Sequence, residues 1–179
     1  DLNEVRAKGE QLGQAVARVI DAGDLRPIDG AMDVSRELVT LTTDTASEQD
    51  LRTHLSAQGY VAEWARHHLD LMAAGEPAQR TFSFEVQSVR FGAALAMVAL
   101  AGEMSVEYAL RFGAEFGGAY RDVWTLGYAN EMVGYVPVRR QIAEGGYEVI
   151  DNNRHLLYTG PFAEDTEERI AAAVHRLLS

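Results

Sequence analysis

Cysteine is absent from the 179 residues of this chain. Disulfide bonds, thiolate zinc sites and a cysteine nucleophile are therefore excluded. The absence leaves the compartment open, because exported bacterial proteins also often lack cysteine. The sequence also shows no signal peptide, no lipidation motif and no apolar run of membrane-spanning length. We therefore expect no transmembrane segment.

Basic side chains are scarce. The chain has 16 Lys and Arg residues against 27 Asp and Glu residues, which gives a formal net charge of −11. Nucleic acids and anionic membrane surfaces both select proteins with basic patches. The charge balance therefore argues against either partner, and we predict no binding to nucleic acid.

Several common catalytic motifs are also missing. The sequence has no GxSxG, HExxH or His-x-His, and no Walker or dinucleotide-binding loop. The glycines of Gly113–Gly118 lack both the spacing and the lysine of a phosphate-binding loop. Serine hydrolases and nucleotide-binding enzymes are thus unsupported.

What is present is typical of one globular domain. Hydrophobic residues make up 47% of the chain and charged residues 24%, and the length allows a substantial core. Apolar residues at helical spacing alternate with shorter apolar or β-branched runs. Helices are predicted at 2–21, after Ser47, after Gly59, at 105–116 and after Asp165, and strands at 34–42, 82–86, 93–101 and 123–128. We predict a single domain, 1–179, of mixed α/β class, in which the strands belong to a mixed sheet with helices packed on it.

The stretch Ala93–Tyr147 contains the clearest candidate site. Its first part, Ala93–Ala101, is almost wholly apolar, which predicts a strand buried on both faces. Gly102 and Glu103 follow directly, before the predicted helix 105–116. The strand 123–128 then leads to a short extended piece that carries Tyr135. Two strand ends are therefore expected to bring a carboxylate and a phenol to one rim of the sheet, where α/β folds commonly bind ligands.

The residues alone leave other interpretations open. Glu103 also fits a carboxylate that is stabilised by the amides and dipole of the following helix. Tyr135 and Tyr147, each beside glycine, also fit packing residues whose hydroxyl groups reach water.

The histidines give little support to a metal site. There are five, and none forms a recognisable ligand pair. His67 and His68 are adjacent, so on a helix their side chains diverge. His68 lies on an apolar helix face and is predicted to be a hydrogen-bonded core residue. We propose none of the five as a ligand.

The runs LAMVALAGEMSVEYALRF, GYANEMVGYVPV, EGGYE and LYTGPF together resemble the neutral/alkaline ceramidases and their bacterial ceramidase-like relatives. The resemblance covers about residues 91–179. It implies a ceramidase catalytic-domain-like fold and zinc-dependent hydrolysis of the N-acyl bond of ceramide or a related lipid amide. It also implies a zinc ion held by Glu103, Tyr135 and two upstream histidines, with Tyr147 as a catalytic hydrogen-bond donor to the amide or its oxyanion.

The same resemblance implies that the chain is the C-terminal part of a larger catalytic domain. The missing N-terminal region would supply both histidines, and the family includes exported and cell-surface enzymes. Arg139 and Arg140 replace more acidic family residues and are interpreted as solvated, or as a modifier of substrate preference. Two alternatives remain: a catalytically silent binding or structural module, and a zinc amidase that acts on a non-lipid amide.

Overall fold

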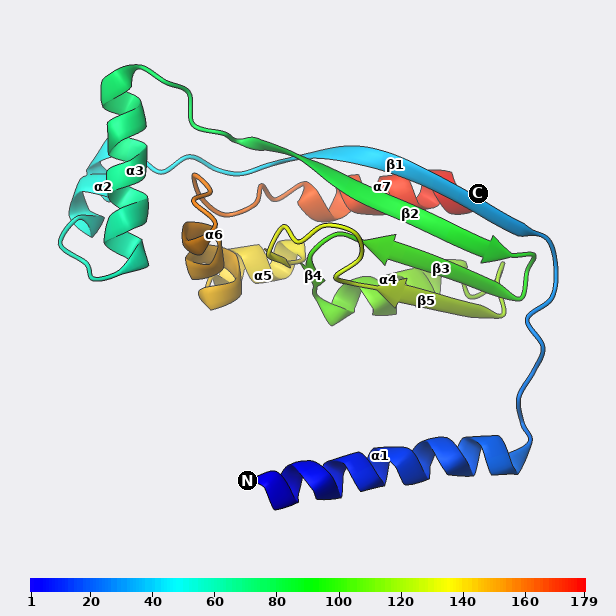
Figure 1. Cartoon of the computed structure of the whole chain (residues 1–179). Coiled ribbons are helices and arrows are strands. Elements are labelled where there is room, and N and C mark those ends of the chain that lie inside the picture. Colours follow the sequence, from blue (N-terminus) through cyan, green and yellow to red (C-terminus); the bar gives the residue numbers. More distant parts are fainter.

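The chain folds around a four-stranded mixed sheet with helices packed on it, and the computed structural model describes all residues, 1–179 (Figure 1). The predicted mixed α/β class is confirmed. In chain order the elements are α1 (Leu2–Ala22), β1 (Met32–Thr42), α2 (Glu48–His54), α3 (Tyr60–Ala74), β2 (Thr81–Phe91), β3 (Leu95–Leu100), β4 (Glu103–Met104), α4 (Val106–Phe116), β5 (Asp122–Leu126), β6 (Tyr135–Val136), α5 (Arg139–Glu144), the π-helix η1 (Tyr147–Asp151), α6 (Asn152–His155) and α7 (Thr166–Leu178).

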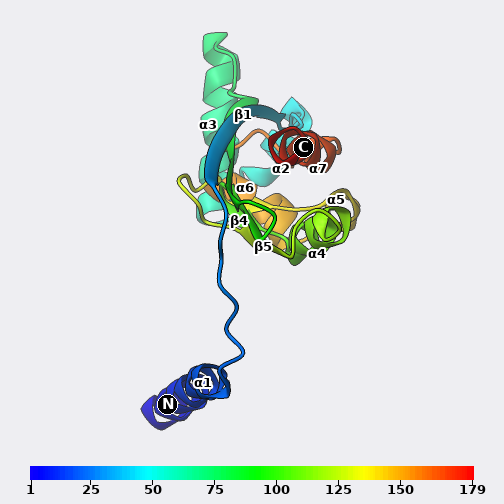
Figure 2. The same cartoon turned by 90° about the vertical axis from the view of Figure 1, so that its right-hand side faces the viewer.

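The sheet has the strand order β1-β2-β3-β5. The pairs β1–β2 and β2–β3 are antiparallel, whereas β3 and β5 run parallel. Parallel neighbours need a crossover connection, and α4 provides it. Helix α7 packs against β1 and β2, and α4 packs against β5. Figures 1 and 2 show both helices on the same side of the sheet.

The main core fills the space between this covered face and the two helices. Its largest fully buried side chains include Phe84, Val86, Val98, Leu100, Tyr108, Phe112, Ile170 and Val174. On the opposite face of β3, Met97 and Ala99 are only half-buried. The predicted burial of this strand on both faces is therefore wrong for these two residues, because no helix covers them.

The two small helices near the middle of the chain follow their sequence signals. Helix α2 begins at the predicted Ser47, where Asp50 completes a capping box in place of the usual Glu or Gln. Helix α3 follows Gly59, and its Trp64 packs with Leu51 in a second, small core. None of the helices combines the length and the apolar character required to span a bilayer.

Helix α1 forms as predicted but touches no other element. Asp1 caps its start through the Asn3 amide, and Gly23 ends it in the left-handed region at φ 69°. No residue of the helix is buried. Figures 1 and 2 agree in placing it apart from the sheet, to which residues 23–31 connect it.

Candidate functional site

The candidate site begins where β3 ends, at a sharp turn through Gly102. This residue has φ 81°, and a Cβ atom there would lie 2.7 Å from the Gly134 carbonyl oxygen. Glycine is therefore required for the two loops to approach each other. Beyond the turn, β4 and β6 form a two-residue parallel pair in which Glu103 lies opposite Tyr135.

Backbone hydrogen bonds hold this pair in place. The Glu103 amide donates to the Gly134 carbonyl at 2.8 Å, and the Gly102 amide donates to the Glu131 carbonyl at 2.9 Å. The Tyr128 amide in turn donates to the Gly102 carbonyl at 2.7 Å. The positions of the side chains at this rim thus depend on main-chain contacts rather than on one another.

Two phenols approach the Glu103 carboxylate. The polar interaction of its hydroxyl group with Glu103, then desolvation, then the negative charge of Glu103 raise the pKa of Tyr128 to about 12, although this residue is 62% exposed. The charge of Glu103 is also the main cause that raises the pKa of Tyr135. A tyrosine hydroxyl group is protonated at neutral pH even without such a shift, so both groups are hydrogen-bond donors, and Glu103 opposes their ionisation at higher pH.

Tyr128 is the site residue that the sequence did not reveal. It lies just beyond β5 and adopts φ 55°, in the left-handed region that residues other than glycine rarely occupy. Such strained residues occur often at functional sites. The available signal was the loop GYAN after the strand, but nothing in it shows that the ring turns back toward Glu103.

Tyr147 lies beside the same rim. It starts the π-helix η1, directly after Gly145 and Gly146, which have φ 72° and 97°. Its ring centroid is 6.1 Å from that of Tyr135, in an edge-on arrangement. The structure thus brings Glu103, Tyr135 and Tyr147 together.

The rim borders a cavity of about 380 Å³. Its lining is Glu103, Met104, Ser105, Val106, Tyr135, Val136, Pro137, Gln141, Glu144, Gly145, Glu148 and Val149. Three of these side chains are carboxylates and none is Lys or Arg. The lining therefore favours neutral or cationic groups over anions.

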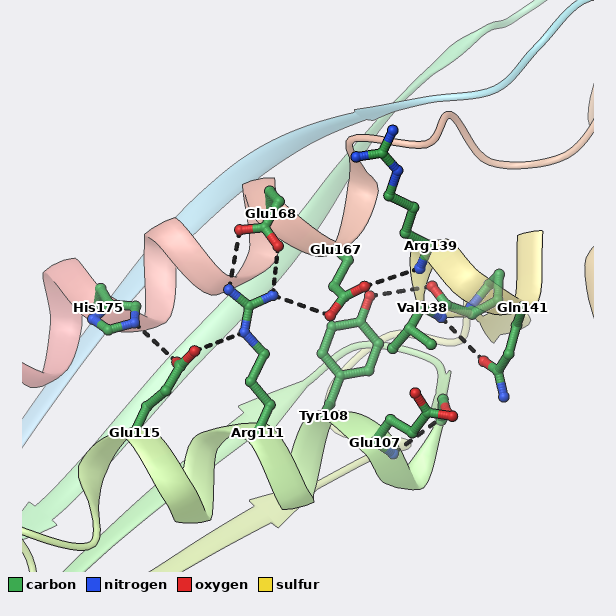
Figure 3. A network of polar contacts seen from close by, with 12 residues as sticks. Glu107, Tyr108, Arg111, Glu115, Val138, Arg139, Gln141, Glu167, Glu168 and His175 are labelled. Atoms are coloured by element: carbon green, nitrogen blue, oxygen red, sulfur yellow. Dashed lines mark hydrogen bonds and ion pairs between the residues drawn. The ribbon is translucent and has the colours of Figure 1, made fainter. Parts of the chain in front are cut away.

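A polar network on the other side of α4 fixes the helix that follows Glu103 (Figure 3). The Arg111 guanidinium donates to carboxylates of Glu115, Glu167 and Glu168, so it joins α4 to α7. Glu167 also accepts from the Arg139 amide at 2.9 Å, at the start of α5. The network thereby links α7 to α4 and α5, and the last two also line the cavity, through Val106, Gln141 and Glu144.

The two adjacent arginines after Tyr135 form ion pairs in the same region. Arg139 forms an ion pair with Glu164 at 3.0 Å. Arg140 forms ion pairs with Glu107 and Glu144. Both side chains lie at the surface and are paired with carboxylates, which fits a structural role on a solvated face.

The residues of this chain by themselves do not fit a zinc site. No group of three His, Cys, Asp or Glu side chains converges anywhere in the structure. Glu103 stands beside phenols, whereas a protein zinc site needs three or four strong nitrogen, sulfur or oxygen ligands. His155, the histidine closest in this aromatic group, stacks on Tyr60 at 3.5 Å and lies 6.4 Å from the Tyr147 ring.

His68 is buried in the core, as predicted, with 4% of its surface exposed. Neither ring nitrogen has a partner in hydrogen-bonding geometry, so the predicted hydrogen bond is not found, although the backbone of Leu157 and Tyr158 lies near. Burial lowers the pKa of the His68 ring, which favours its neutral form.

The sequence matches no known family model and no curated protein. Among solved structures, the fold is similar to the crystal structure of neutral ceramidase from Pseudomonas aeruginosa, with 16% sequence identity and a TM-score of 0.42. The similarity covers 83% of this chain and 28% of that enzyme's chain. A likeness this distant does not establish the family or the activity.

Proposed function

We propose that the rim formed by Glu103, Tyr128, Tyr135 and Tyr147 binds the amide group of an N-acyl lipid, such as ceramide. We further propose that Glu103 and Tyr135 belong to a zinc amidohydrolase site that two histidines from another segment complete. The observation that supports this is the pairing of Glu103 with Tyr135 in the β4–β6 ladder, with the Tyr147 ring 6.1 Å from Tyr135.

The polar groups at the rim match those of an amide. An amide N–H needs an acceptor, which the Glu103 carboxylate supplies, and an amide carbonyl needs a donor. The hydroxyl groups of Tyr128 and Tyr135 are protonated at neutral pH and can be these donors. In hydrolysis the carbonyl oxygen becomes an oxyanion, and a donor such as the Tyr147 hydroxyl stabilises that charge.

The charge of the cavity restricts the ligand further. Glu144 and Glu148 line it together with Glu103, and no basic side chain does so. A phosphate or carboxylate would be repelled, whereas a neutral amide with hydroxyl groups would not. The lipid part of the proposal depends on the resemblance of residues 91–179 to ceramidases, and so does the zinc, because this chain alone does not supply enough ligands.

The test uses the longest product of the gene that encodes this sequence. Bound zinc is measured by elemental analysis, and hydrolysis is measured with a short-chain fluorescent ceramide and a water-soluble N-acyl amide. We expect one zinc ion per molecule and ceramide hydrolysis, with both lost in Glu103→Ala and Glu103→Gln. The matched control is Glu148→Gln, which removes another carboxylate of the same cavity and should retain zinc.

Other outcomes would favour the alternatives. Zinc with hydrolysis of the soluble amide alone would replace the lipid by a non-lipid substrate. Ceramide binding without zinc or hydrolysis would indicate a catalytically silent binding module. Equal zinc content in Glu103→Gln and the unmodified protein would contradict the role of Glu103 as a ligand.

A further inference from the structure

Helix α1 carries an apolar stripe that nothing covers. We define this stripe as Leu2, Val5, Leu12, Val16, Val19 and Ile20, whose side chains are between 52% and 86% exposed. They recur at helical spacing, so they share one side of the helix. Gly9 and Gly13 lie on the same side, with no atom within 4 Å of the position of a Cβ.

The four-stranded sheet has an uncovered face of the same character. On the side away from α4 and α7, the register places Val34, Val89, Met97 and Trp124 in one row across all four strands. The neighbouring row consists of Met32, Phe91, Leu95 and Asp122. Leu95 is only 2% exposed and Asp122 is charged, so this second row is not an open apolar surface. Val34 and Trp124, at the two edges, are each 52% exposed. We call the row Val34, Val89, Met97 and Trp124 the open face.

The open face lies at the end of the sheet where α1 is attached. The row begins at Val34, near the start of β1, and α1 joins β1 through residues 23–31. Within that connection, the Pro27 carbonyl accepts a hydrogen bond from Arg121 at 3.1 Å, and the Ala31 carbonyl accepts one from the Gly92 amide at 3.1 Å. These bonds attach residues 27–31 to the rest of the fold, so only residues 23–26 are free to act as a hinge for α1.

We propose that α1 folds back and packs its apolar stripe on the open face of its own sheet. A hinge this short keeps the helix at an effective concentration on the order of millimolar near the face, which disfavours a partner from dilute solution. With 21 residues, α1 is roughly 31 Å long. The open face crosses four strands that lie about 4.8 Å apart, so it accommodates part of the stripe.

The composition of the helix agrees with this contact. Glycine in a helix interior costs about 1 kcal/mol relative to alanine, so two glycines within an apolar stripe need a compensating reason. Gly9 and Gly13 allow the helix backbone to approach a flat apolar surface closely. The opposite side of the helix is polar and carries Glu4, Glu10, Gln14, Arg18 and Asp21, so it suits contact with water.

Trp124 provides the test, because it lies on the open face while Trp64, the other tryptophan, is 3% exposed in a separate core. We expect Val16→Asp in the stripe to shift the emission of the intact chain to longer wavelength and to increase its quenching by acrylamide. The matched control Gln14→Asp, on the polar side, should change neither. In a Trp124→Phe background, Val16→Asp should have no effect on the remaining emission.

Sedimentation at several protein concentrations identifies the occupant. A monomer whose Trp124 is protected at every concentration supports the proposal. Protection that grows with concentration together with a dimer would show that a second copy covers the face, and would overturn it. Trp124 equally quenched in the intact chain and in Val16→Asp would show that α1 does not pack there, and would also overturn it. Since Val16 contacts no other element, circular dichroism should show both variants folded.

Discussion

The Glu103→Gln substitution should lower the pKa of Tyr128 from about 12 toward the ordinary tyrosine value near 10. The largest cause of the raised value is the polar interaction of the hydroxyl group with the Glu103 carboxylate, followed by desolvation and then by the charge of Glu103. Glutamine keeps an acceptor oxygen but removes the charge, so phenolate formation is no longer opposed by a neighbouring anion. The pKa of Tyr135 should fall in the same variant, because the charge of Glu103 is the main cause of its raised pKa.

The assay is a spectrophotometric titration of tyrosinate. The chain has seven tyrosines, so the curve of Tyr128 is obtained as the difference between each protein and its Tyr128→Phe partner. Glu148→Gln is the control, since this carboxylate does not contribute to the pKa of Tyr128. A Tyr128 pKa near 10 in the unmodified protein, or near 12 in Glu103→Gln, would refute the arrangement of the rim.

Three further predictions concern stability. Arg111→Met should lower the free energy of unfolding by about 1–3 kcal/mol, because it removes charged hydrogen bonds to three glutamates, and urea denaturation would measure the loss. Gly102→Ala should cost a similar amount, about 1–3 kcal/mol, since a Cβ at φ 81° would press on the Gly134 carbonyl, and thermal melts would show it. His68 resists protonation in the fold, so its contribution to stability should fall as pH drops below about 6.5. A shallower loss in His68→Gln than in the unmodified protein, measured by denaturation at several pH values, would verify it.

The parts of the fold that the sequence predicted are those with a local cause. Helix α4 follows the predicted amphipathic run 105–116, with Tyr108, Phe112 and Phe116 buried, and the structure adds that Ser105 caps it. The approach of Glu103 to Tyr135 followed from two strands that end at the same edge. The roles of Glu103, Tyr135 and Tyr147 in binding zinc or substrate remain predictions.

The parts that were not predicted depend on residues far apart in the chain. Met97 and Ala99 are left uncovered because α4 and α7 occupy the other face of the sheet. A strand covered on one face and a strand covered on both can have the same run of apolar residues, so the sequence does not distinguish them. Tyr128 has a left-handed backbone and interacts with Glu103, and the residue type at that position predicts neither feature. The short elements α5, η1 and α6 are too brief to show a period.

Backbone hydrogen bonds position the rim, so its side chains can be changed without disrupting the fold. The amide of Glu103 bonds to the Gly134 carbonyl, and the amide of Ser105 bonds to the Val136 carbonyl at 3.3 Å. These bonds persist whatever side chain stands at position 103, and the Tyr135 side chain is likewise not needed for the ladder. Glu103→Gln and Tyr135→Phe should therefore unfold at nearly the same denaturant concentration as the unmodified protein. A loss of ligand or metal binding in these variants can then be assigned to the removed charge or hydroxyl group, since the backbone that positions it is unchanged.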